Sequence, residues 1–145
     1  MKFSIIIPTY NNFNYLKLCI NSIVKNSKFN HEIIVHINGH DETTENYLKS
    51  NKYIYTKSDQ NIGLCSGVNR AAKKSTTEYI VYAHDDMYFL PNWDQYLVNE
   101  IKLMSDNLFF LSSTQLSHYA QGKDTINHIY FDAGKTINDF NEQKI

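Results

Sequence analysis

Residues 79–87 read YIVYAHDDM, and this stretch carries the clearest sequence signal for both fold and function. Residues 79–83 form an apolar run of the length of a buried strand, and the run ends abruptly in His84, Asp85 and Asp86. Adjacent carboxylates repel each other and are costly to remove from water. Where a strand ends in two acids, a cation or a ligand therefore usually compensates their charge. The pattern favours a divalent metal ion that carries phosphates. The alternative is a turn that simply begins at the two acids.

Length and composition predict one domain. The chain has 145 residues, of which 42% are hydrophobic and 20% are charged, which is enough apolar material for one core. The formal net charge of -1, without blocks of Lys or Arg, argues against nucleic acid as a partner. The apolar run at residues 3–7 is too short for a signal peptide or a transmembrane segment. We therefore expect a cytoplasmic protein, either free or peripheral at the membrane.

Short apolar strands alternate with amphipathic helices along the chain. The expected strands are residues 3–7 (broken at Pro8), 33–37, 53–55, 79–83 and 108–111, with a last extended piece at 126–131; the expected helices are 13–26, 43–48, 63–74 and 93–104. This alternation predicts the α/β class, with a Rossmann-like, mostly parallel sheet and flanking helices.

In such a sheet, ligands bind at the carboxyl ends of the strands, where loops and helix N-termini meet. Four polar segments follow the first four expected strands, at residues 8–12, 38–41, 61–67 and 84–87. We expect them to lie together and to bind a polar ligand.

These segments carry a resemblance to a known family. In chain order the motifs are Pro8-Thr9-Tyr10, Asn38-Gly39, Asn61-Ile62-Gly63, Asn69-Arg70, Asp85-Asp86 and Leu90-Pro91-Asn92-Trp93. Each motif alone is weak, but their order and spacing over about the first hundred residues resemble the nucleotide-sugar-binding half of a family 2 glycosyltransferase with the GT-A fold.

The resemblance implies a metal-dependent, inverting glycosyltransferase of the hexosyl type. Its donor would be a nucleoside diphosphate sugar, with a UDP-sugar favoured, and its acceptor a saccharide, a lipid or a protein. The implied donor-binding residues are Pro8, Thr9, Tyr10, Asn38, Asn61, Gly63, Asn69, Arg70 and Asp85. Asp86 would ligate Mn²⁺ or Mg²⁺, and Asp85 would hold the ribose or assist the metal, because hard oxygen ligands suit these ions.

Two positions depart from the family pattern. Ile37 stands where the family usually has an aspartate that pairs with the base. Asn38 could instead bind a uracil edge, Asp41 could reach back into the site, or the base could differ from uracil. His84 occupies the first position of the metal motif, where a hydrogen-bonded neighbour is a more common role for histidine than a ligand.

The region after the metal motif is short for the family. Only residues 87–145 follow it, so we expect residues 1–145 to be a single GT-A-like domain, truncated at the C-terminus, whose acceptor half and general base lie outside the chain. Asp132, Asp139 and Glu142 are acids of the right type, but none lies in a motif. The alternative function is a non-catalytic module that binds a nucleotide or a glycan. A nucleotidyltransferase is less favoured, because the first strand does not lead into a Gly-rich, basic phosphate loop.

Overall fold

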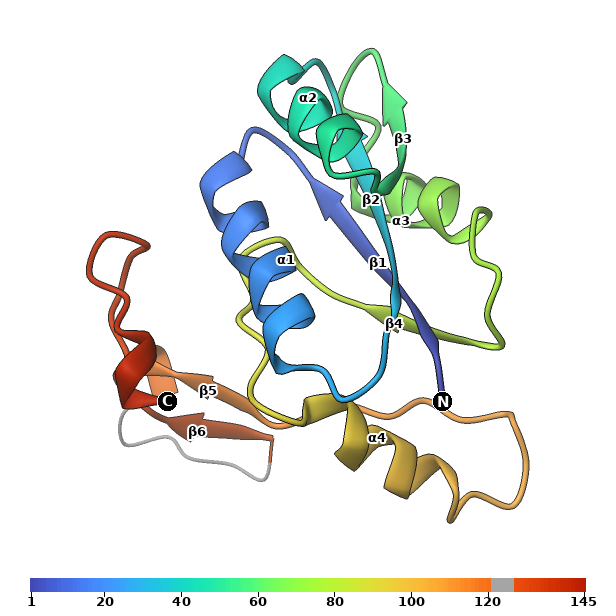
Figure 1. Cartoon of the computed structure of the whole chain (residues 1–145), viewed down its shortest axis with the longest axis vertical. Helices are drawn as coiled ribbons and strands as arrows, with labels where there is room; N and C mark the ends of the chain where they lie inside the picture. The colour runs from blue at the N-terminus through green and yellow to red at the C-terminus, as the bar shows by residue number, and fades with distance from the viewer. Residues whose placement is uncertain (121–126) are drawn as a thin grey trace. The chain divides into compact units, whose positions relative to one another are not determined.

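The structure is a computed structural model that describes residues 1–120 and 127–145 (Figure 1). Its chain forms two compact units, Met1–Val98 and Asn99–Ile145. The first unit contains a four-stranded sheet with helices, and the second contains a two-stranded sheet.

The four-stranded sheet is parallel throughout and has the strand order β3-β2-β1-β4. Its strands are β1 (Phe3–Thr9), β2 (Glu32–Asn38), β3 (Ile54–Ser58) and β4 (Tyr79–Tyr82). Every residue of β1 and β2 is buried, as expected for central strands covered on both faces, which read as continuous apolar runs. The predicted α/β class with a parallel, Rossmann-like sheet is confirmed.

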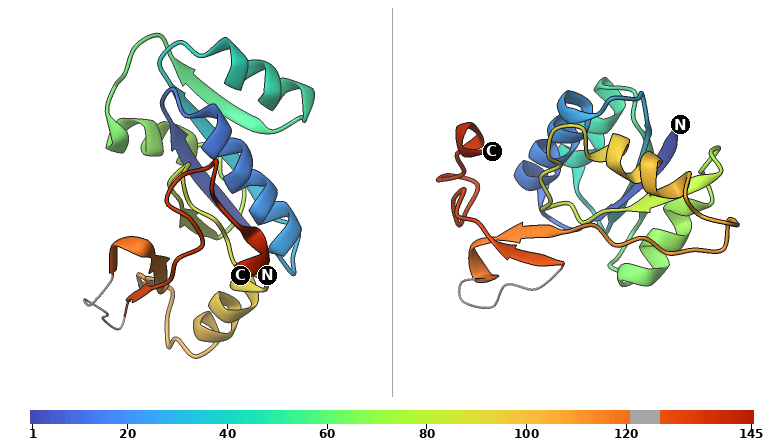
Figure 2. Two further views of the ribbon diagram at one scale, coloured as in Figure 1. Left: turned by 90° about the vertical axis from the view of Figure 1, so that its left-hand side faces the viewer. Right: turned by 90° about the horizontal axis from the view of Figure 1, so that it is seen from below.

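Helices cover both faces of this sheet (Figure 2). The covering helices are α1 (Phe13–Asn26), α2 (Glu42–Ser50) and α3 (Leu64–Ala72); a fourth helix, α4 (Trp93–Ile101), follows β4 along the chain. On one face, Ala71 of α3 packs against Ile6 of β1 and Ile34 of β2. α1 and α2 lie on the opposite face (Figure 2), where Phe13 and Tyr47 form an edge-to-face ring contact.

Several predicted boundaries differ from the structure. β1 continues through Pro8. The pairing of β1 with β4 ends at Ile6↔Tyr82, so Pro8 pairs only with β2, and the proline, which has no N–H, costs little there. β3 extends to Ser58, and α4 ends at Ile101.

The predicted strand at residues 108–111 is wrong. Leu108 and Phe110 are 94% and 91% exposed, and no partner strand pairs with this run within the described residues. Among its described residues, the second unit instead pairs β5 (Gln115–Ser117) with β6 (His128–Tyr130) and has two short 3₁₀ helices, His118–Ala120 and Glu142–Lys144. Residue 126 of the predicted last extended piece lies outside the described residues.

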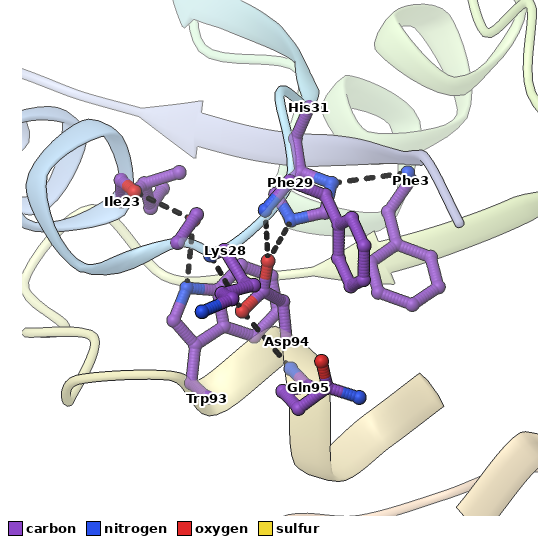
Figure 3. A network of polar contacts seen from close by, with 9 residues as sticks. Phe3, Ile23, Lys28, Phe29, His31, Trp93, Asp94 and Gln95 are labelled. Carbon is purple, nitrogen blue, oxygen red and sulfur yellow. Dashed lines mark hydrogen bonds and ion pairs between the residues drawn. The ribbon is translucent and has the colours of Figure 1, made fainter. Parts of the chain in front are cut away.

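A buried carboxylate joins the start of α4 to the segment that leads into β2 (Figure 3). Asp94 has no exposed surface and accepts four hydrogen bonds. The donors are the backbone N–H groups of Lys28 (2.9 Å), Phe29 (2.8 Å) and Gln95 (2.9 Å) and the Nε2 atom of His31 (3.0 Å). Burial alone would raise the pKa of Asp94, but these donors outweigh it and hold the pKa below its ordinary value.

His31 extends this network to β1. Its Nδ1 accepts from the N–H of Phe3 at 3.2 Å, so Nε2 carries the proton that it donates to Asp94. The His31 ring stacks on Phe3 with centroids 5.1 Å apart and lies 5.2 Å from the ring of Trp93. The Trp93 indole N–H donates to Ser27 Oγ at 3.0 Å. Trp93 therefore packs at the amino ends of β1 and β2, away from the carboxyl ends of these strands.

Buried titratable groups make the stability depend on pH. Burial lowers the pKa of His31 and of His36 below 6.5, so both bind protons more readily in the unfolded chain, and stability falls as the pH drops through that value. The lowered pKa values of Asp94 and Glu32 continue this loss below pH about 4.5. We expect a lower urea midpoint at pH 5 than at pH 7.5.

The histidine contribution can be measured separately. His36→Gln should flatten the dependence of the urea midpoint on pH between 7.5 and 5, whereas His40→Gln, whose side chain is 80% exposed in the native protein, should leave it unchanged. Equal wild-type midpoints at the two pH values would contradict this account.

Candidate functional site

The acidic loop after β4 is bound to the loop after β1. Thr9 Oγ1 donates to Asp85 Oδ2 at 2.6 Å, and Asn12 Nδ2 donates to Asp85 Oδ1 at 3.0 Å. Thr9 was a candidate from the sequence and Asn12 was not, because an asparagine just before a helix is usually a cap. The structure thus brings two of the four predicted segments together at the carboxyl edge of the sheet.

α1 also contacts this loop. Cys19 Sγ donates to the carbonyl oxygen of His84 at 3.5 Å. Burial, with the negative charges of Asp85 and Asp86, raises the pKa of Cys19 to about 12, so the thiol stays protonated and remains a donor.

The two acids have different surroundings. Asp86 is exposed, and within residues 1–120 and 127–145 no side chain donates a hydrogen bond to it. His84 Nε2 lies 3.1 Å from the Tyr82 hydroxyl, and the two rings are 5.1 Å apart, so His84 is a hydrogen-bonded neighbour of Tyr82. Asp85 is held and Asp86 is left available.

The segments after β2 and β3 are joined through two asparagines. Asn38 Nδ2 donates to Asn61 Oδ1 at 3.0 Å, and Asn38 Oδ1 accepts from the N–H of Ile62 at 2.8 Å. Asn61 Oδ1 also accepts from the N–H of Gly63 at 2.8 Å. The Asn38 side chain, nearly buried, therefore fixes the loop that leads into α3. Its use on a uracil edge stays a prediction.

Two glycines shape this edge. Gly63, the N-cap of α3, has φ 81° and ψ 162°, a region open essentially only to glycine. Gly39 has φ 122°, and a Cβ there would lie 3.3 Å from Cε2 of Tyr10. The Tyr10 ring therefore lies beside Gly39 and is 54% exposed, so one face can stack on a planar ligand. Pro8, by contrast, is buried inside β1.

For the α3 candidates Asn69 and Arg70, no hydrogen bond to residues 84–87 is seen within the described residues. Asn69 lines a shallow cavity of about 240 Å³ with Leu64, Cys65, Val68 and Tyr82. Burial raises the pKa of Tyr82, and the charges of Cys65, Asp85 and Asp86 add to this, so the cavity lies within electrostatic range of the acids. Arg70 is exposed. Burial is the main cause of the lowered pKa of His36, and the positive charge of Arg70 is the second cause.

The structure bears on one of the alternatives for base recognition, the use of Asp41. Asp41 is the N-cap of α2, where its carboxylate accepts from the Thr44 N–H at 3.0 Å and the Thr44 hydroxyl at 2.6 Å. It does not reach back toward the site. Ile37 is 2% exposed and packs in the core.

The acidic pair fits one kind of metal site. No group of three or more His, Cys, Asp or Glu side chains suited to a metal gathers within the described part of the chain. Mg²⁺, however, is usually bound by one or two carboxylates together with the phosphates of a substrate, and Mn²⁺ prefers the same hard oxygen ligands. Asp86, exposed and without a donor, fits a cation that arrives with a diphosphate.

Fold and site together define a class: an α/β domain of the GT-A type, whose acidic loop lies at the carboxyl edge of a parallel sheet. The sequence model of Glycosyl transferase family 2 matches residues 4–115, and the chain belongs to this family. The predicted resemblance is confirmed.

Three known proteins illustrate the similarity. An "Uncharacterized glycosyltransferase" of Rickettsia bellii (strain RML369-C) is 33% identical over 116 residues, which are 78% of this chain and 16% of that protein. The crystal structure of S. aureus TarS 1-349 in complex with UDP matches with a TM-score of 0.61 and 27% identity, covering 71% of this chain and 32% of that one. The mannosyltransferase PcManGT of Pyrobaculum calidifontis, in complex with GDP-Man and Mn2+, shares the fold, with a TM-score of 0.59, 18% identity and coverage of 79% and 34%.

The chain thus spans 16% of the rickettsial relative and about a third of the two solved chains. None of the helices in the described residues combines the length and the apolar character that crossing a membrane requires.

Proposed function

We propose that this chain is the donor-binding part of a metal-dependent, inverting glycosyltransferase, which moves a sugar from a nucleoside diphosphate sugar to a saccharide, lipid or protein acceptor. One observation carries the proposal: the acidic loop is fixed at the carboxyl edge of the sheet by the Thr9–Asp85 hydrogen bond, with Asp86 exposed beside it. We place its action in the cytoplasm, free or peripheral at the membrane.

The residues suggest an arrangement for the donor. The exposed face of Tyr10 stacks on the base, and Asp85 accepts from the ribose hydroxyls. The fixed loop from Asn61 to Gly63 and the positive N-terminal end of α3 face the phosphates, with Arg70 on the same helix as a further cation. A UDP-sugar is the favoured donor, in keeping with the UDP bound by TarS.

Asp86 is the proposed ligand of Mn²⁺ or Mg²⁺, with Asp85 as its neighbour. When bound, the ion would neutralise charge that develops on the departing diphosphate. The chain's own residues would then orient the donor and hold the diphosphate at the sheet edge.

The second candidate is a binding module without catalysis, and one observation favours it. Two of the three late acids that have the chemistry of a general base serve local turns: Asp132 accepts from the N–H of Gly134, and Asp139 accepts from the N–H groups of Lys135 and Thr136. Slow hydrolysis of a bound UDP-sugar, in which water takes the sugar and UDP is released, would favour the enzyme. Binding without any turnover would favour the module.

Asp86→Asn tests the metal assignment. We expect the variant to lose the gain in UDP or GDP affinity that Mn²⁺ gives the wild type, a loss of about tenfold or more, because it removes a charged oxygen ligand. Isothermal titration with Mn²⁺ and with EDTA measures both affinities. Asp59→Asn, an exposed acid outside the cluster, is the matched control. An unchanged Mn²⁺ effect would overturn the metal assignment, and a wild type that binds no nucleotide would overturn the donor site itself.

A further inference from the structure

We propose that Thr9 and Asn12 are positioning residues of the donor site: they fix both oxygens of the Asp85 carboxylate in the orientation that its contact with the nucleoside requires. This inference rests on the proposed function.

The first argument is a helix cap that is not made. Asn12 is the N-cap of α1, where an asparagine side chain commonly accepts a hydrogen bond from the N–H two or three residues later. The Asn12 side chain makes no such bond, and its amide nitrogen donates to Asp85 instead. α1 thus begins without the stabilising contact that its own N-cap residue could provide, and the side chain serves the acidic loop.

The second argument is that the two donors come from separate, well-fixed places. Thr9 is buried and pairs with Ile37 in the β1–β2 register, so its hydroxyl has little freedom. Asn12 lies at the start of α1. One donor meets each oxygen of the Asp85 carboxylate, at 2.6 and 3.0 Å, so both the position and the plane of this carboxylate are set.

The third argument is the contrast with Asp86. Each Asp85 oxygen, after one hydrogen bond, keeps the capacity to accept another from a hydroxyl group of a ligand. Asp86 has no donor in the described part of the chain and stays exposed. His84 lies between the end of β4 and Asp85, and the Cys19 thiol donates to its carbonyl oxygen. This bond anchors the loop while Asp86 remains available.

Titration of nucleotide with and without metal separates the two roles. Thr9→Val replaces the hydroxyl with a methyl group, and Asn12→Ala removes the amide. Each should weaken the affinity for UDP or GDP in EDTA by about tenfold, because the Asp85 carboxylate is no longer held in the orientation in which it accepts from the nucleoside. The ratio of affinities with and without Mn²⁺ should stay at the wild-type value. Asp86→Asn should show the opposite pattern. Saturation-transfer NMR with the same nucleotide measures affinities too weak for calorimetry.

Matched variants show whether the effect depends on the hydrogen bonds. Thr9→Ser keeps the hydroxyl and should restore the metal-free affinity, and Asn14→Ala, an exposed asparagine in the same turn of α1, should change nothing. All titrations are made at temperatures where circular dichroism shows the variants to be folded.

Three results would overturn the proposal. Thr9→Val and Asn12→Ala could lower the thermal midpoint and leave the affinity for nucleotide unchanged, which would make the two residues purely structural. They could instead abolish only the Mn²⁺ effect, which would place Asp85 on the metal. A wild type that binds no nucleotide would overturn the proposed function, and this inference with it, and is recognised before any variant is made.

Discussion

Asp94→Ala is expected to lower the free energy of unfolding by about 3–5 kcal/mol, the range for removing one partner from a buried charged network. In the native protein Asp94 has no exposed surface and accepts from three backbone N–H groups and from His31. Alanine would leave these donors without their acceptor (Figure 3). Most of the loss therefore comes from unsatisfied donors.

Urea unfolding followed by far-UV circular dichroism measures this loss. The fluorescence of Trp93, the single tryptophan of the chain, reports on the same cluster through its contact with His31. Asp94→Asn should cost less, because one oxygen acceptor remains, and Asp59→Ala should change the free energy by no more than about 0.5 kcal/mol, as for other surface substitutions. A loss below about 1 kcal/mol for Asp94→Ala would contradict the assigned network.

This network is distant from the proposed donor site, and that gives a second check. His31 and Phe3 lie at the amino ends of β2 and β1, whereas Asp85 contacts Thr9 at the carboxyl end of β1. Where Asp94→Ala remains folded, its affinity for nucleotide should equal that of the wild type.

The central sheet could be predicted because its strands and helices leave local patterns in the sequence. Buried parallel strands read as apolar runs such as residues 33–37, and amphipathic periodicity marks the helices between them. The run at 108–111 has the same composition, but a strand also needs a neighbour with which to pair. Whether a neighbour exists depends on the tertiary arrangement, so the apolar run alone gave the wrong answer there.

The site was predictable only in outline. The rule that ligands bind at the carboxyl edge placed Thr9 and Asp85 in neighbouring segments, and the structure joins them at 2.6 Å. It could not show that the side chain of Asn12, the N-cap of α1, binds Asp85 instead of capping the helix, or that Asn38 is used to fix Asn61. Each asparagine has several possible hydrogen-bond partners within reach, and only the folded geometry selects among them.

Gly67→Ala is expected to destabilise the protein by about 2 kcal/mol, which is the reverse of the usual sign. In an exposed helix interior, alanine is more favourable than glycine by about 1 kcal/mol. Here a Cβ on residue 67 would lie 2.6 Å from Cδ2 of His36, a separation at which something must shift. Overpacking of this kind costs about 1–3 kcal/mol.

The His36 ring cannot easily move away. It is fully buried, its Nδ1 lies 2.8 Å from the Thr56 hydroxyl, and its Nε2 lies 3.4 Å from the Ser58 hydroxyl. Ser58 in turn lies within 3.4 Å of Asn38 Oδ1, which belongs to the loop that fixes the start of α3. A displaced His36 ring would therefore disturb both the core under α3 and the Asn38–Asn61 contact, so nucleotide affinity should fall together with stability.

A double-mutant cycle tests whether the contact with His36 is the cause. His36→Ala removes the ring. In that background Gly67→Ala should stabilise by about 1 kcal/mol through helix propensity instead of destabilising by about 2 kcal/mol, a coupling free energy of about 3 kcal/mol. Ser66→Ala, one residue earlier on an exposed part of the same helix, controls for propensity alone. Equal effects of Gly67→Ala with and without the His36 ring would show that close packing of α3 on β2 does not limit this position. The link from His36 to the proposed donor-binding loop would then have to be abandoned.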